Sequence, residues 1–189
     1  DALLRARSPA EAVEAWFDAN PALWSRGACV LWSTHWPRDI VAWPAALADA
    51  KVIADAIDAV SRSRAGMNDD DTPRVLHDDG DAVALLHCPG GALVPDPQAS
   101  ARIGELLDMQ RMQESVSRLE QAEKLQRSLY AIADMAGSDF DMPDLLRGLH
   151  RIVSDLMYAE NFYIALYDGD DDSLRFLYFS DVVDDALVD

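Results

Sequence analysis

The chain has 189 residues, of which 50% are apolar and 26% are charged, a balance typical of globular proteins rather than disordered ones. Sixteen Lys and Arg oppose 34 Asp and Glu, which gives a formal net charge of −18. A surface this negative repels phosphate backbones and anionic lipid headgroups, so we expect neither nucleic-acid nor membrane-surface binding. The two cysteines are too few for a disulfide scaffold, and we expect a cytoplasmic protein.

The first predicted element is a helix that begins near residue 9. Ser8 can cap this helix, Pro9 suits its first turn, and Glu11 completes a capping box with Ser8. The helix is expected to end at Pro21, because the residue before a proline is restricted to extended conformations.

Two strands and a second helix are predicted next. Residues 28–34 and 39–43 are rich in β-branched and aromatic side chains, and a turn at Pro37 separates them. Pro44 suits the first turn of a helix, which we expect to cover residues 44–63. The residues expected to face inward on this helix are Leu47, Ile53, Ile57 and Val60.

A hairpin follows after a polar loop over residues 65–73. Two apolar runs within residues 74–88 flank Asp79-Gly80, a pair favoured in tight hairpin turns. Residues 92–94 are expected to add a brief strand. Strands joined by tight turns, with helices packed on them, predict an α+β domain with an antiparallel sheet over residues 1–104.

A long helix is predicted over residues 97–136, and a helix of ~40 residues is ~60 Å long. Its apolar residues first follow a 3-4-3 spacing, which is typical of a coiled coil, and then shift phase through Ala122. We expect a parallel homodimer whose seam consists of Met109, Met112, Val116, Leu119, Leu125, Leu129 and Ile132. The alternative is that this apolar stripe packs only on the helix's own domain.

The last part of the chain resembles a known family. Residues 145–157 read "LLRGLHRIVSDLM", and they precede the predicted strands "NFYIALYD" and "LRFLYFSDVVD". Together with the preceding helix, residues 125–189 resemble the first half of a GAF domain. The resemblance is strongest to GAF domains of bacterial multidomain signalling proteins that carry a diguanylate cyclase, a cyclic-di-GMP phosphodiesterase or a histidine kinase domain downstream.

The resemblance implies a non-catalytic sensory and dimerisation module that relays a signal through the long helix to an output domain. It also implies that the chain, which begins at Asp1 rather than Met, is a piece of a longer protein. The element order of residues 1–104 is GAF-like as well, with a PAS domain as the alternative. The second interpretation of the whole is a degenerate GAF-like scaffold without a small-molecule ligand.

Five tryptophans lie within the first 43 residues. They could form the wall of a pocket for an unknown small molecule, although large aromatic side chains more often supply the core of a small domain. These tryptophans are Trp16, Trp24, Trp32, Trp36 and Trp43.

The sequence gives no reason to expect a metal, a cofactor or catalysis. His87 and Cys88 are adjacent and would point to opposite faces of a strand, so they do not form a ligand pair with His35, His77 or Cys29. Residues 168–172 read "DGDDD", but the later positions of a calcium loop are not matched, and both this run and residues 68–71 are interpreted as solvated turns. No nucleophile, P-loop or dinucleotide motif is present.

Overall fold

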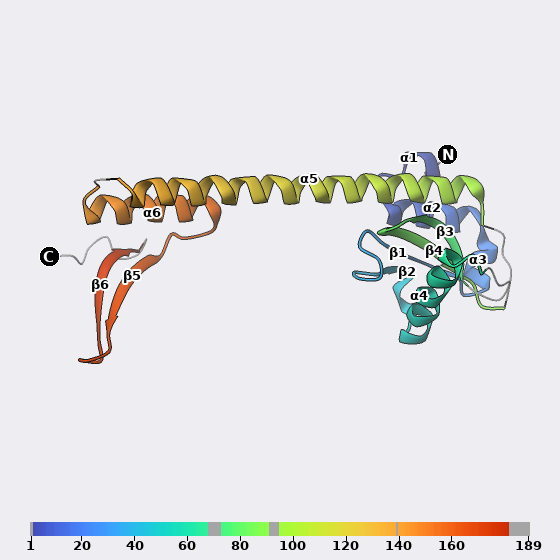
Figure 1. The fold of residues 1–189 in the computed structure, drawn as a ribbon. Helices are drawn as coiled ribbons and strands as arrows, with labels where there is room; N and C mark the ends of the chain where they lie inside the picture. Colours follow the sequence, from blue (N-terminus) through green and yellow to red (C-terminus); the bar gives the residue numbers. More distant parts are fainter. Residues whose placement is uncertain (1, 68–72, 91–94, 139, 182–189) are drawn as a thin grey trace. The chain divides into compact units, whose positions relative to one another are not determined.

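The computed structural model describes residues 2–67, 73–90, 95–138 and 140–181 of the chain (Figure 1). It is a mixed α+β structure with antiparallel sheets and one long helix, as predicted. The chain forms two compact units, Asp1–Ser115 and Val116–Asp189, which are described separately below. The predicted strand at residues 92–94 and the polar run at 68–71 lie outside the described residues.

Unit 1 contains a four-stranded antiparallel sheet with the strand order β2-β1-β4-β3. In chain order its elements are α1 (Ala2–Arg5), α2 (Pro9–Ala19), α3 (Pro21–Ser25), β1 (Cys29–Ser33), β2 (Val41–Trp43), the 3₁₀ turn η1 (Ala45–Leu47), α4 (Ala50–Arg64), β3 (Arg74–Asp79), β4 (Ala82–His87) and the start of α5 (Pro97–Ala136).

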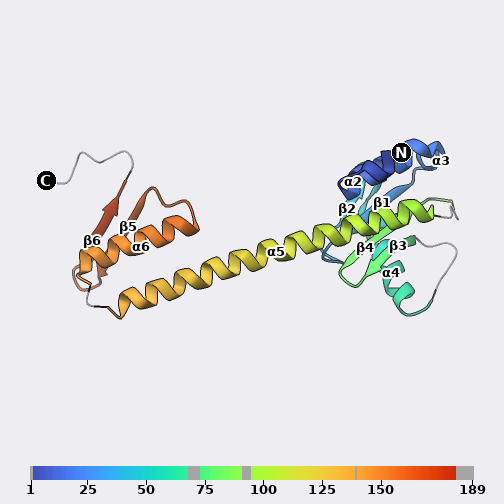
Figure 2. The same cartoon turned by 90° about the horizontal axis from the view of Figure 1, so that it is seen from above.

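Helices cover both faces of this sheet (Figure 2). On β4, Ala84 and Leu86 pack towards α2 and α5, whereas Val83 and Leu85 pack towards α4. Because successive residues of a strand point to opposite faces, a strand covered on both sides must be apolar throughout. This explains why β1 and most of β4 are continuous apolar runs rather than alternating ones.

Helix α2 begins where its capping residues predict, with one difference in detail. The Ser8 hydroxyl oxygen accepts a hydrogen bond from the Glu11 backbone N–H at 3.3 Å. The Glu11 carboxylate accepts from the backbone N–H of Arg7 at 2.6 Å, one residue earlier than the reciprocal bond of a capping box. Both side chains therefore still satisfy backbone donors at the start of the helix.

The predicted start of the second helix is wrong. Pro44 precedes only the short turn η1, and α4 begins at Ala50, where the Asp49 carboxylate accepts the Val52 N–H at 2.8 Å. The Asp49 side chain accepts a hydrogen bond from an amide in the first turn, and a proline has no side-chain acceptor that could do this. The helix therefore begins after Asp49 rather than at Pro44. Leu47 is consequently 40% exposed instead of facing inward. The other three predicted residues are half-buried (Ile53, Ile57) or buried (Val60).

The predicted hairpin is confirmed as β3 and β4. Gly80 has a φ of 71°, a left-handed conformation that glycine adopts without steric cost, and its N–H donates to the Asp78 carboxylate at 3.1 Å. An irregularity between Val75 and His77 shifts the register of β3 against β4.

Unit 2 contains the rest of α5, then α6 (Met142–Leu156) and the hairpin of β5 (Phe162–Asp168) and β6 (Ser173–Ser180). The Asp141 carboxylate caps α6 by accepting the Asp144 N–H at 2.9 Å. His150 joins α6 to the hairpin, because its ring stacks on Phe162 and its Nδ1 lies 2.9 Å from the Tyr178 hydroxyl. These elements are the ones predicted for residues 141–181.

The observed start of α4 can be tested by removing its cap. We expect Asp49→Ala to lower the free energy of unfolding by ~1 kcal/mol, because the Val52 amide loses its acceptor. Asp58→Ala, at an exposed position within the same helix, serves as the control and should change stability little. Urea unfolding followed by circular dichroism measures both, and equal effects of the two changes would contradict the cap.

Candidate functional site

Helix α5 buries its first turns in unit 1. Ala99, Ile103, Leu106 and Leu107 are almost fully buried and belong to the core between α2 and the sheet. Because a helix turns by ~100° per residue, these four side chains occupy one side of α5. The apolar residues of α5 that follow Leu107 do not belong to this core, so its packing does not explain why they are apolar.

The predicted seam residues are mostly exposed. The exposed fraction runs from 46% for Met109 to 70% for Leu119, while Ile132 is half-buried. Near Ile132, Met135 of α5 lies against Gly148 of α6, so the end of α5 packs partly within unit 2. The members with exposed side chains are Met109, Met112, Val116, Leu119, Leu125 and Leu129.

The seam consists of two stripes that point in different directions. At ~100° per residue, the direction of the set from Ala122 to Ala136 differs by roughly 140° from that of the set from Met109 to Leu119. The turn of direction comes from two consecutive steps of three residues, from Leu119 to Ala122 and on to Leu125. A partner helix can follow both stripes only if α5 is overwound at this point.

Polar contacts fix α5 to the sheet where it leaves the core of unit 1. The Asp108 carboxylate lies 3.1 Å from His77 Nε2, and Arg111 donates to the Asp79 carboxylate at 2.7 Å. One turn further, the Thr34 hydroxyl donates to Glu114 Oε2 at 2.9 Å. We call this set the exit clasp; it consists of Asp108, Arg111 and Glu114 on the helix and His77, Asp79 and Thr34 on the sheet side.

The clasp continues into the loop after β1. Gln110 donates to the second oxygen of Glu114 at 2.9 Å, and His35 Nδ1 lies 3.1 Å from the Thr34 hydroxyl. The Ser33 hydroxyl accepts the His35 backbone N–H at 2.9 Å and donates to the Arg38 carbonyl. The loop that holds Thr34 is therefore itself held by side-chain hydrogen bonds.

A glycine lets the sheet and the helix approach at the clasp. Gly104 is buried in α5 beneath His77, and a Cβ atom at this position would lie 2.5 Å from His77 Nδ1. Any other residue would push the imidazole away from Asp108. Sequence reasoning missed the clasp, although polar residues spaced three apart beside an apolar stripe could have indicated its helical half.

The tryptophans do not line a common pocket wall. Trp16 and Trp32 are buried in the core on the α2 and α5 side of the sheet, and Trp36 is buried in the core on the α4 side. Trp43 packs edge-on against Trp24, with ring centroids 5.1 Å apart. Trp16, Trp32 and Trp36 are therefore core residues, whereas Trp24 is 48% exposed beside Trp43.

The fold brings Cys29 close to His87 and Cys88 but, among the described residues, gives no group suited to bind a metal. Cys29 on β1 is buried opposite His87 on β4, and burial raises the pKa of its thiol to about 11. Such a thiol is rarely ionised and is a poor nucleophile or metal ligand. Within the part of the chain that the structure describes, no group of three or more His, Cys, Asp or Glu side chains could hold a metal ion.

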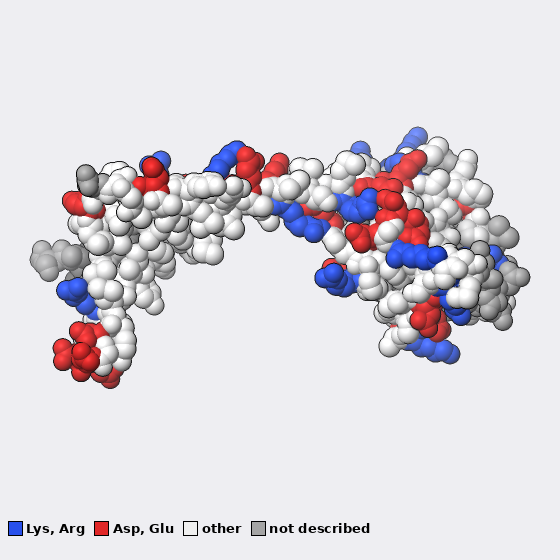
Figure 3. All heavy atoms as spheres, viewed as in Figure 1, with Lys and Arg blue, Asp and Glu red and all other residues white. Residues whose placement is uncertain are grey.

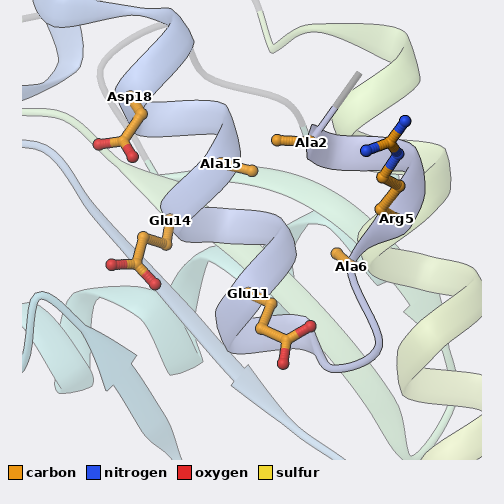
Figure 4. Close-up of a pocket in the computed structure, with 7 residues that line it drawn as sticks. All are labelled: Ala2, Arg5, Ala6, Glu11, Glu14, Ala15 and Asp18. Atoms are coloured by element: carbon orange, nitrogen blue, oxygen red, sulfur yellow. The ribbon is translucent and has the colours of Figure 1, made fainter.

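An open hollow of about 460 Å³ lies between α1 and α2. Figure 4 shows that Glu14 and Asp18 extend on the side of α2 away from Arg5, so the charged groups do not converge on one point. The Glu11 carboxylate is already bonded to the Arg7 amide. The hollow is lined by Ala2, Arg5, Ala6, Glu11, Glu14, Ala15 and Asp18, and it offers no enclosed binding site.

Acidic side chains gather at the turn between β5 and β6 on the face shown in Figure 3. The Asp168 carboxylate accepts the Asp170 N–H at 3.0 Å, and the Tyr167 hydroxyl donates to Asp172 at 3.0 Å. These bonds hold the turn together through its own side chains.

No protein-family model matches the chain, and no curated protein or solved structure matches it either. None of the helices among the described residues combines the length and apolarity needed to cross a membrane.

The ion pair beside the clasp makes a pH-dependent contribution to stability. The Arg64 guanidinium hydrogen-bonds the Asp78 carboxylate and holds the pKa of that carboxyl below its ordinary value. A lowered folded-state pKa stabilises the fold above the ordinary Asp pKa, and this stabilisation is lost as the pH falls through the folded-state value.

We therefore expect Asp78→Asn to destabilise the protein by a constant amount above about pH 5 and by progressively less as the pH falls below about 4. Urea unfolding across this pH range measures the difference from the unsubstituted chain. Asp58→Asn is the control, because it removes an exposed carboxylate and so measures the effect of losing one acidic group without an ion pair. A destabilisation by Asp78→Asn that stays the same down to the lowest pH would contradict the ion pair.

Proposed function

We propose that the chain is a non-catalytic sensory and dimerisation module of a bacterial signalling protein, in which two copies pair in parallel through α5. The observation that carries the proposal is the stripe of Met109, Met112, Val116 and Leu119, which leaves the core of unit 1 and stays exposed in the single chain. Apolar side chains at 3-4-3 spacing are stabilised by a second helix with the same spacing.

The arrangement of unit 1 supports a GAF-like assignment. Helix α2, which precedes the first strand, and α5, which follows the last described one, share a core on one face of the antiparallel sheet. Helix α4 covers the other face. A PAS domain remains the alternative, since its helices also lie between the second and third strands, but it does not account for the joint packing of α2 and α5.

Unit 2 supports the same proposal through the elements that carry the resemblance. Helix α6 and the β5–β6 hairpin have the order and the lengths expected for the first half of a GAF domain. Several large side chains of the hairpin are exposed, among them Tyr163, Phe176 and Phe179. In the proposed domain, further strands would cover such side chains.

The change of direction along α5 provides a physical basis for signal relay. The stripe before Leu119 and the stripe after Ala122 cannot both pack on a straight partner helix, so the pair has alternative arrangements of similar energy. A ligand or a partner that favours one arrangement would change how the following domain is presented. The output, by resemblance, is a diguanylate cyclase, a cyclic-di-GMP phosphodiesterase or a histidine kinase.

The dimer can be tested with charged substitutions in the seam. We expect Val116→Lys and Leu119→Lys each to weaken dimerisation by at least about 100-fold, because each places a charge in an apolar helix interface. Light scattering after size exclusion should then give the 20.8 kDa mass of one chain instead of twice that mass.

Ser117→Lys is the matched control, since Ser117 is exposed and lies on another side of the same helix turn. It should leave the dimer intact. An unsubstituted chain with the mass of one copy, or a seam variant that dimerises as well as the control, would refute the proposed pairing.

A ligand-free scaffold is the second candidate function, and the packing of unit 1 favours it. Side chains fill both faces of the sheet, and the described hollow lies at the surface between α1 and α2 rather than over a strand. In this interpretation unit 1 only holds the helix pair together or binds another protein.

Thermal unfolding in the presence of a library of nucleotides and metabolites separates the two candidates. A ligand at 100 times its Kd stabilises the folded state by about 2.7 kcal/mol, which shifts the melting temperature by several degrees. We expect such a shift for the sensor and none for the scaffold. The unfolded chain under denaturing conditions provides the control for unspecific binding.

A further inference from the structure

We infer that the exit clasp sets the direction in which α5 presents its seam, and that it is the place where changes in unit 1 reach the helix pair. This inference rests on the proposed dimer and assigns its regulation. The clasp residues of α5 alternate along the helix with the first seam residues: Asp108 precedes Met109, and Arg111 precedes Met112.

The clasp and the seam occupy different sides of the same two turns. At ~100° per residue, Glu114 points to the same side as the core-facing Leu107, Arg111 lies between this side and the seam, and Asp108 borders the seam. A rotation of α5 about its axis would therefore turn the seam and separate the clasp pairs together. As long as the hydrogen bonds of the clasp are formed, the side of α5 on which Met109 and Met112 lie keeps a fixed direction relative to the sheet.

Two of the three partners on the sheet side, Thr34 and Asp79, lie at connections between strands. Thr34 follows the last residue of β1, and its loop is held by Ser33, whereas Asp79 ends β3 at the hairpin turn. Arg111 reaches both the Asp79 carboxylate and its backbone carbonyl, at 2.7 and 3.2 Å. A shift of either connection is therefore transmitted directly to α5.

The clasp is also the weaker of the two attachments of α5. Its ion pair between Arg111 and Asp79 is partly exposed, with side-chain exposed fractions of 34% and 59%. Such pairs contribute little each, whereas the buried side chains of Ile103 and Leu107 contribute much more. The clasp can thus open while the first turns of α5 stay in the core.

The test compares two triple variants of the full chain. The clasp variant carries Asp108→Ala, Arg111→Ala and Glu114→Ala. The control variant carries Glu123→Ala, Arg127→Ala and Asp134→Ala, which removes the same three residue types from the exposed part of the same helix. Alanine favours helix in both, so circular dichroism should show unchanged helix content.

The first readout is disulfide formation between copies, measured with Met112→Cys on the seam and Ser117→Cys away from it. Cys88→Ser is introduced throughout, and the buried Cys29 is left in place. With an intact clasp, we expect Met112→Cys to cross-link at least about fivefold faster than Ser117→Cys. In the clasp variant this ratio should fall about threefold, and in the control variant it should not change.

The second readout is amide hydrogen exchange over residues 108–116, which does not depend on dimerisation. We expect exchange about threefold faster in the clasp variant than in the control variant. An unchanged cross-linking ratio in a dimeric clasp variant overturns the inference. If no variant dimerises, the proposed function fails. If hydrogen exchange is also the same in the clasp and control variants, the attachment of α5 by the clasp is overturned as well.

Discussion

The structure depends on one constraint: unit 1 can bury only the first turns of the 40-residue helix α5. The first turns of the helix are buried between α2 and the sheet, and this burial supplies a large part of one of the two cores of unit 1. The helix then extends well past the residues that share this core. Everything proposed for the protein follows from the apolar side chains that the helix carries beyond that point.

The sheet of unit 1 explains why this burial is stable. Strands β1 and β4 are covered on both faces, so the residues that face α5 cannot rearrange without disturbing those that face α4. Close packing of this kind makes the start of α5 a rigid base. The polar clasp is attached to β3 through His77 and Asp79 and to the loop after β1 through Thr34, so it links the edge of the same sheet to the exposed part of the helix.

The sequence predicted the elements better than their contacts. Ser8 and the Asp79-Gly80 turn are local signals, and each correctly placed the element beside it. The start of α4 was wrong because two local signals, Pro44 and Asp49, competed within six residues, and only the hydrogen bond to Val52 decides between them.

The candidate site was predicted in part, for the same reason. The stripe of α5 follows from spacing alone, and spacing belongs to one helix. The clasp joins residues that are 80 positions apart in the case of Thr34 and Glu114, and nothing in either local sequence identifies the partner. The tryptophans show the converse, since their closeness in sequence suggested one wall, whereas Trp36 is buried on the α4 side of the sheet and Trp16 and Trp32 are buried on the α2 and α5 side.

The close contact between Gly104 and His77 limits the kinds of motion that α5 can undergo. A piston-like translation by one helical turn, ~5.4 Å, would bring Ser100 or Asp108 to the place of Gly104, where a Cβ atom would lie 2.5 Å from His77 Nδ1. Such sliding would displace the imidazole and so break its contact with Asp108. Twisting, or bending with its pivot at this glycine, displaces the helix without that clash.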